Sequence, residues 1–195
     1  MAAAGSARTQ PDDPQYTAAV EVARLLAVEG FSIITGGGPG VMEAANRGAK
    51  DVGALSVGCN IRLPHEQRPN EYLDVSIDFN YFFVRKVMLV KYSYAFVVMP
   101  GGFGTLDEMF EALTLIQTKK ILDFPVVVMG REYWSGMDEQ LERMVANGMI
   151  DRTDLNLLLV TDDMDEAINH VRKTVAERFK LHPRRRPIRA LGEVA

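Results

Sequence analysis

The sequence has few of the residues that build disulfide frameworks and metal sites. Among its 195 residues there is one cysteine, Cys59, so no intramolecular disulfide forms and no cysteine-based zinc cluster is expected. The three histidines, His65, His170 and His182, are too scattered to indicate a metal site. We therefore expect a protein without a metal centre.

Long apolar runs and an excess of positive charge are also missing. No run reaches the roughly 18–20 apolar residues that span a bilayer, and the first eight residues lack the apolar region of a secretory signal. The formal net charge is −4, which provides no general attraction for a polyanion. These absences predict a cytoplasmic protein that binds neither membranes nor nucleic acids.

The remaining composition is ordinary for one globular domain, with 47% hydrophobic and 25% charged residues. We expect a single nucleotide-binding α/β domain over residues 1–180. Residues 181–195 are basic and include the run His-Pro-Arg-Arg-Arg-Pro. Contact of this tail with a partner is the alternative, but its composition favours a flexible extension, and we assign it no function.

Hydrophobic periodicity predicts strands alternating with helices of ten or more residues. The expected strands are 31–35, 55–61, 72–77, 94–99, 125–129 and 157–160, and the expected helices are 15–29, 41–49, 81–91, 106–118, 136–147 and 164–179. Such alternation is typical of a doubly wound, Rossmann-like parallel sheet with helices on both faces. Ligands of this fold bind at the carboxyl ends of the strands.

The start of the chain departs from this pattern. A doubly wound sheet normally opens with a strand before the first helix, but residues 1–4 are too short and too small to predict a convincing one. The opening strand is therefore expected to be absent or minimal, and a start of the chain set too late would explain it.

Two glycine-rich loops follow expected strands. Residues 36–40 read Gly-Gly-Gly-Pro-Gly, and residues 100–105 read Pro-Gly-Gly-Phe-Gly-Thr. Neither matches a Walker A loop or the Gly-x-Gly-x-x-Gly fingerprint, which argues against ATP and NAD. Glycines before a helix let backbone N–H groups approach a phosphate, but they also serve tight turns. For the first loop alone, both interpretations stay open.

The second loop carries polar groups. Thr105 and Glu108 have the spacing of a capping box at a helix start, and on spacing alone this structural interpretation is favoured over catalysis. Arg85 lies in the apolar stretch 81–91, which is expected to be mostly buried. A cation there is either a surface arginine paired with a carboxylate or a group that needs an anionic ligand.

The sequence from Pro100 to Glu108 resembles the Pro-Gly-Gly-x-Gly-Thr-x-x-Glu signature of the Lonely Guy family, the cytokinin riboside 5′-monophosphate phosphoribohydrolases long mislabelled as lysine decarboxylases. Arg85 and Lys86 resemble the family's Arg-Lys pair, residues 36–42 its upstream glycine loop and residues 5–8 its first loop. Residues 60–72 are similar to the longer bacterial members. The chain departs from the family at the opening strand and in the basic tail.

The resemblance implies hydrolysis of the N-glycosidic bond of an N6-modified adenosine 5′-monophosphate, with release of the free base and ribose 5-phosphate and without a cofactor. It implies that Glu108 and Arg85 are catalytic. Substrate binding is implied for a larger set: Gly101, Gly102, Gly104 and Thr105 at the 5′-phosphate, Lys86 and Met88 nearer the nucleotide, and Gly37, Gly38 and Ser6 in the other two loops.

The resemblance also implies a homodimer or a dimer-based hexamer with the active site near the subunit interface. Two other functions stay open, a broader nucleosidase acting on AMP and related nucleotides, and a non-catalytic nucleotide-binding module. A lysine decarboxylase is not expected, because none of the lysines 50, 86, 91, 119 and 120 has a context suited to a Schiff base.

Overall fold

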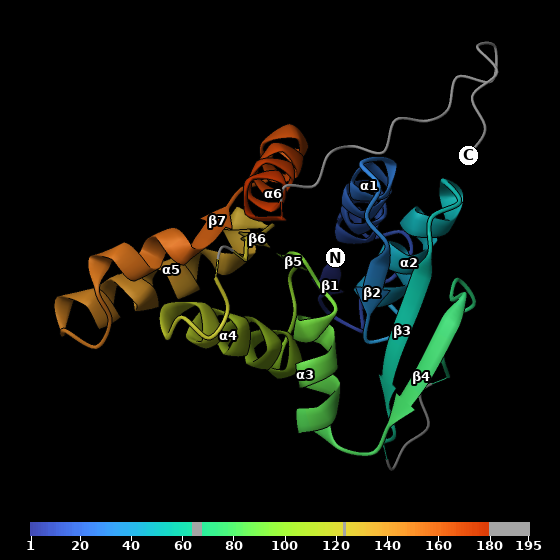
Figure 1. The fold of residues 1–195 in the computed structure, drawn as a ribbon, viewed down its shortest axis with the longest axis horizontal. Coiled ribbons are helices and arrows are strands. Elements are labelled where there is room, and N and C mark those ends of the chain that lie inside the picture. The colour runs from blue at the N-terminus through green and yellow to red at the C-terminus, as the bar shows by residue number, and fades with distance from the viewer. Residues whose placement is uncertain (64–67, 123, 180–195) are drawn as a thin grey trace.

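The computed structural model describes residues 1–63, 68–122 and 124–179, which form three layers with a parallel sheet between two layers of helices (Figure 1). The strands are β1 (Ala2–Ala4), β2 (Ile33–Thr35), β3 (Ser56–Ile61), β4 (Val75–Phe79), β5 (Phe96–Val98), β6 (Val126–Val128) and β7 (Leu158–Val160). The helices are α1 (Pro14–Val28), α2 (Val41–Asp51), α3 (Phe82–Lys91), α4 (Phe103–Gln117), α5 (Arg131–Ala146) and α6 (Met164–Phe179), with a 3₁₀ turn at Arg152–Leu157. The expected fold class is confirmed.

The strands of the described chain have the order β4-β3-β2-β1-β5-β6-β7, and every pairing is parallel. The opening strand, which is expected to be absent or minimal, is present and minimal, with three residues. β1 lies at the centre of the sheet, where Ala2 pairs with Ile34 on one side and with Phe96 on the other. Three alanines form this strand because its neighbours supply the hydrogen bonds, so pairing overrides their low strand propensity.

The alternating side chains of the strands divide the core between the two helical layers. Ala3, Val97 and Val127 pack with α1, α2 and α6, whereas Ala2, Val98 and Val126 pack with α4 and with Trp134 of α5. Because both faces of the central strands are covered, β1, β5 and β6 are apolar throughout rather than alternating, as buried parallel strands are. Among the described residues, no helix is long and apolar enough to cross a membrane.

Two helices begin several residues earlier than the periodicity predicts. α4 begins at Phe103 rather than at residue 106, and α5 begins at Arg131 rather than at residue 136. Gly130 adopts a left-handed conformation before α5, and the Asp162 carboxylate accepts hydrogen bonds from the N–H groups of Gly130 and Arg131. The cap of α5 thus comes from the loop after β7, which is remote in the sequence.

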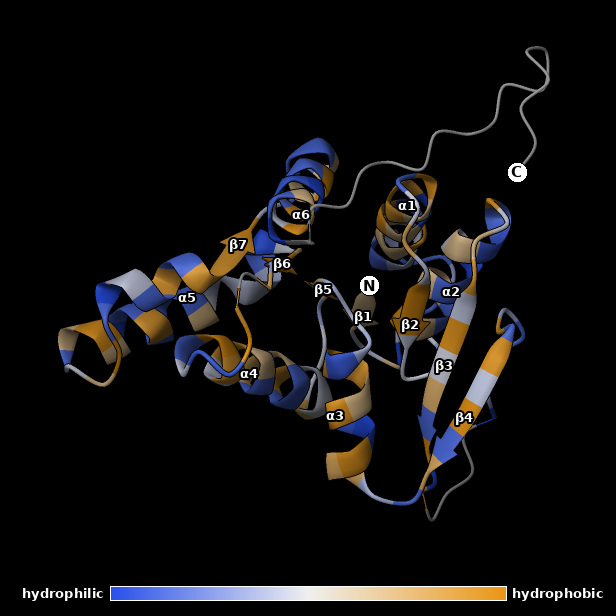
Figure 2. Cartoon of the chain, viewed as in Figure 1, coloured by the Kyte–Doolittle hydropathy of each residue, from blue (hydrophilic) through white to orange (hydrophobic). Residues whose placement is uncertain are grey.

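The expectation that the apolar helix 81–91 is mostly buried is also wrong. In α3 only Leu89 is fully buried, whereas Phe83 is 66% and Val87 53% exposed. Figure 2 shows apolar residues along α3 and along β4, the strand at the edge of the sheet. Hydrophobicity alone did not distinguish a core helix from one whose apolar side chains remain uncovered in a single chain.

Two helical glycines differ in the space around them, so their substitution by alanine should have opposite effects on the free energy of unfolding. A Cβ atom at Gly48 of α2 would lie 2.2 Å from the Val20 carbonyl oxygen of α1, whereas a Cβ at Gly136 of α5 meets nothing within 4 Å. Gly48→Ala should therefore push the helices apart and lower the free energy of unfolding by roughly 1–3 kcal/mol. Gly136→Ala should raise it by about 0.5–1 kcal/mol through helix propensity.

Urea unfolding followed by circular dichroism measures both variants under the same conditions. A Gly48→Ala protein as stable as the parent would contradict the close packing of α1 against α2.

Candidate active site

A cavity of about 930 Å³ opens at the carboxyl ends of the central strands. It lies where the chain order reverses between β1 and β5, the position at which doubly wound sheets bind ligands. Its lining comes from the loops after β1, β2 and β5, from the end of β3, and from α3, α4 and α5. Most of the residues that the sequence singles out therefore meet in one place.

The loop after β1 joins the two glycine loops through its backbone. The Ser6 N–H donates to the Pro100 carbonyl at 2.9 Å, and the Ser6 carbonyl accepts from the Val41 N–H at the start of α2, also at 2.9 Å. Gly40 adopts a positive φ of 69°, and a Cβ there would lie 2.4 Å from the Ser6 oxygen. The first glycine loop is thus needed for close approach of the β1 loop, and the first N–H of α2 already has a partner.

The start of α4 remains open. Its N-cap is Gly102, and in the described chain no side chain caps it and no acidic residue lies in its first turn. The capping box proposed for Thr105 and Glu108 is therefore wrong, because the helix begins two residues before Thr105. Uncapped N–H groups at a helix N-terminus and the positive end of the helix dipole form an anion-binding site.

Arg85 and Glu108 form an ion pair at the wall of the cavity. Arg85 Nη2 of α3 donates to Glu108 Oε1 of α4 at 2.8 Å, and the two side chains are only 11% and 13% exposed. The guanidinium also lies against the first glycine loop, where a Cβ at Gly36 would be 2.6 Å from Nη2. The absence of a side chain at Gly36 therefore makes room for Arg85.

Burial raises the pKa of Glu108 above its usual value, and the Arg85 charge opposes this shift. Asp107 and Glu111 raise the pKa of Glu108 further, whereas Lys86 lowers it. A buried carboxyl group with a raised pKa beside a fixed cation, facing a cavity, is suited to proton transfer. The nearby Cys59 thiol is buried and its pKa is raised to about 11, so it is not a nucleophile at neutral pH.

Lys86 lines the cavity, but its ammonium group is paired. Lys86 Nζ lies 2.7 Å from Glu111 Oε2 and 3.2 Å from Asp107 Oδ1, and these carboxylates raise its pKa. A Schiff-base lysine requires a neutral amine, so this pairing argues against decarboxylase chemistry at the only lysine among the described cavity residues. Glu111 and Asp107 instead make Lys86 a link between α3 and α4.

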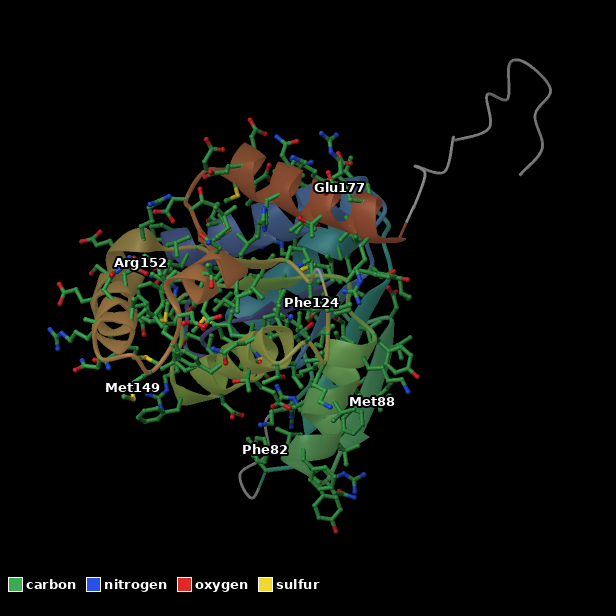
Figure 3. All side chains as sticks on the ribbon, turned by 60° about the vertical axis from the view of Figure 1, so that its left-hand side comes forward. Phe82, Met88, Phe124, Met149, Arg152 and Glu177 are labelled. Carbon is green, nitrogen blue, oxygen red and sulfur yellow. The ribbon has the colours of Figure 1, made fainter. Side chains whose placement is uncertain are left out.

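The remaining expected site residues divide into two groups. Ser6, Gly38, Gly101, Gly102, Gly104 and Thr105 line the cavity together with Arg85 and Glu108. Gly37 and Met88 do not. The Gly37 N–H instead donates to Thr35 Oγ1 at 2.9 Å in a buried hydrogen bond within the loop. Met88 lies further along α3 than Phe82, which does line the cavity (Figure 3).

Sequence reasoning missed several cavity residues, among them Arg8, Asn60 and Tyr133. Tyr133 had a detectable signal, since it follows a predicted strand at the same edge of the sheet. Periodicity does not select it, because the predicted start of α5, at residue 136, comes after it. Of the three histidines only His170 lies within the described residues, and these contain no cluster of side chains that could hold a metal ion.

Comparison with known families agrees with this geometry. A family described as "possible lysine decarboxylase" matches residues 42–171, which is more than half of the chain. The cytokinin riboside 5′-monophosphate phosphoribohydrolase of Mycobacterium tuberculosis is 30% identical over 155 residues, which cover 77% of this chain and 81% of the relative. The chain belongs to the Lonely Guy family. Curated members of this family are thus named as hydrolases of N-glycosyl bonds, despite the decarboxylase description.

Solved structures confirm the Rossmann-like fold of this Lonely Guy family member. A molybdenum cofactor binding protein from Rippkaea orientalis superposes with a TM-score of 0.66 at 23% identity, covering 89% of this chain and 94% of that one. The Moco carrier protein of Chlamydomonas reinhardtii gives a TM-score of 0.62 at 25% identity, covering 90% and 94%. The same fold therefore also occurs in proteins named for binding a cofactor.

Proposed function

We propose that the cavity binds an N6-modified adenosine 5′-monophosphate and hydrolyses its N-glycosidic bond to give the free base and ribose 5-phosphate. The observation that carries this proposal is the buried Arg85–Glu108 pair in the same cavity as the open N-terminus of α4. The named activity of the family's curated members supports it.

The 5′-phosphate belongs at the start of α4 rather than at the start of α2. The first N–H of α2 already donates to Ser6, and Glu43 lies in the first turn of α2, where its charge opposes an anion. α4 has neither obstacle. Its N-terminal N–H groups, together with the Thr105 hydroxyl, provide donors for the phosphate oxygens.

Glu108 would then face the ribose. Cleavage of an N-glycosidic bond passes through an oxocarbenium-like transition state, whose positive charge a carboxylate stabilises. Glu108 orients water and accepts its proton as the water oxygen bonds to the anomeric carbon and the base departs with the bonding electrons. Arg85 holds the carboxylate in place, and its charge lowers the pKa of Glu108 and so favours the ionised form against the effect of burial.

Glu108→Gln tests this role. Purified protein is incubated with N6-isopentenyladenosine 5′-monophosphate and, separately, with AMP, and the free base and ribose 5-phosphate are followed by chromatography. We expect turnover to fall by roughly 10²- to 10⁴-fold while nucleotide affinity, measured by calorimetry, changes little. Glu139→Gln, at an exposed carboxylate of α5, is the matched control.

If Glu108→Gln kept full turnover, the assigned chemistry would be wrong. The rate with AMP relative to the prenylated nucleotide distinguishes a cytokinin-specific enzyme from a broader nucleosidase.

The raised pKa of Glu108 predicts an acidic limb in the pH profile of kcat/KM. A carboxylate base is lost as the pH falls through its pKa, and burial moves this point above the ordinary value of 4.5. Activity should therefore fall with decreasing pH at a midpoint higher than 4.5. The residual activity of Glu108→Gln should lack this limb, and a limb that persists in the variant would assign it to another group.

A binding or carrier function is the second candidate, because two structural relatives are named as molybdenum cofactor binding or carrier proteins. A carrier requires the open start of α4 but not a buried Arg85–Glu108 pair. The same assay separates the two functions, since binding of both nucleotides without cleavage by the parent protein would favour the carrier.

A second copy of the chain is proposed to cover the α3–β4 face, which we define by Tyr81, Phe83, Val87, Val75 and Ile77. Each of these apolar or aromatic side chains is at least 41% exposed in the single chain. Contiguous exposed apolar surface is typical of an interface. Phe82, the neighbour of this face, lines the cavity, so a dimer formed here would bring the partner close to the active site.

Phe83→Asp tests this interface, because it places a charge on the α3–β4 face. Sedimentation velocity over a range of concentrations should show a dimer for the parent and at least tenfold weaker self-association for the variant. Val28→Asp, at a similarly exposed apolar residue of α1, should remain dimeric. A monomeric parent protein would contradict the proposal.

A further inference from the structure

Tyr133 connects α5 to the glycine signature. It lies in the first turns of α5, its hydroxyl donates to the Gly101 carbonyl at 2.8 Å, and it lines the cavity. The signature motif does not include this residue, because it comes from a helix that follows the next strand. A side chain from outside the signature therefore forms a hydrogen bond with the backbone of the signature loop.

The contact completes a set of three bonds to successive carbonyl groups. The Pro100 carbonyl accepts from the Ser6 N–H at 2.9 Å, the Gly101 carbonyl from Tyr133, and the Gly102 carbonyl from the Leu106 N–H at 3.0 Å. With these acceptors engaged, an anion entering the loop meets N–H donors rather than carbonyl oxygens. Tyr133 provides the only one of the three bonds that comes from a side chain.

The Gly101–Gly102 peptide is the one that most needs such a bond. Because a trans peptide is planar, its carbonyl and its N–H point in opposite directions, and rotation of the plane exchanges them. A peptide between two glycines meets the least steric resistance to this rotation. A rotated peptide would present a carbonyl oxygen to a phosphate and repel it.

α5 is itself held in a fixed place against the signature. A Cβ at Gly130 would lie 2.7 Å from the Pro100 ring, so the turn before α5 packs directly on the loop. The Asp162 carboxylate caps this turn, and the buried Trp134 donates its ring N–H to the Met129 carbonyl at 3.0 Å. The Tyr133 ring packs edge-on against the Trp134 ring, with 4.7 Å between the ring centroids. Tyr133 is thus preorganised before a ligand binds.

We infer, on the basis of the nucleotide-binding function proposed above, that Tyr133 is a positioning residue for the 5′-phosphate. Its hydroxyl holds the Gly101–Gly102 peptide with the carbonyl toward α5 and the Gly102 N–H directed away from it. Tyr133 thereby acts on substrate binding through the backbone and takes no part in breaking the glycosidic bond.

Tyr133→Phe removes the hydroxyl and keeps the ring. One hydrogen bond of ordinary strength corresponds to a roughly 2- to 10-fold effect, so KM for the nucleotide should rise by that factor while kcat changes by less than twofold. The dissociation constant of ribose 5-phosphate, measured by calorimetry, should rise in parallel, whereas that of free adenine should not. Tyr92→Phe, at an exposed tyrosine, is the control.

Two results would overturn the inference: an unchanged KM, with or without a fall in kcat, or a loss of affinity explained by a lower melting temperature. The ribose 5-phosphate titration separates this inference from the proposed function. A parent protein that binds the sugar phosphate without cleaving nucleotides would contradict the hydrolase, and the same titration of Tyr133→Phe would still decide the role of the hydroxyl.

Discussion

The backbone of Ser6 is the point on which the arrangement of the site depends. Its N–H donates to the carbonyl of Pro100, the first residue of the glycine signature, and its carbonyl accepts from the first N–H of α2, so one peptide segment fixes the distance between two βα loops. This segment can reach both loops only because β1 lies between β2 and β5. The three alanines of β1 and the short loop that follows them therefore bring Ser6 and Pro100, which are remote in the sequence, into one cavity.

The start of α4 determines the role of Glu108. If the helix began at Thr105, Glu108 would lie in the first turn and satisfy the helix's own N–H groups. Because it begins at Phe103, Glu108 lies one turn further along, and side chains that tilt toward the helix N-terminus bring it to Arg85 instead. A difference of two residues thus separates a structural cap from a buried ion pair and leaves the helix dipole free for a ligand.

The exact start of α4 is one of the features of the site that the sequence could not predict. Periodicity and glycine loops predicted the alternating elements, the parallel sheet and the edge at which the loops meet, since these follow from local patterns. They did not predict the α5 cap, because Asp162 is remote in sequence, or the strand formed by residues 2–4, because pairing rather than propensity forms it. The exposure of α3 could not be predicted, because an apolar pattern shows that a helix has apolar side chains but not whether the same chain buries them.

The charges around the cavity favour one orientation of a nucleotide. α4 contributes Asp107 and Glu108 to the cavity wall and Glu111 as a partner of Lys86 behind it, while α3 contributes Arg85 and Lys86, so this group of side chains carries an excess of negative charge when all are ionised. A phosphate is repelled from this wall and attracted to the uncapped N–H groups one turn away. The ribose of the proposed substrate, which carries positive charge only in the transition state, is the part of the ligand that such a wall stabilises. The site must bind an anionic phosphate and also stabilise a positive charge on the ribose. Arg85 makes both possible, because it balances the charge of Glu108 for an anion that binds nearby while the carboxylate stays within reach of the developing cation.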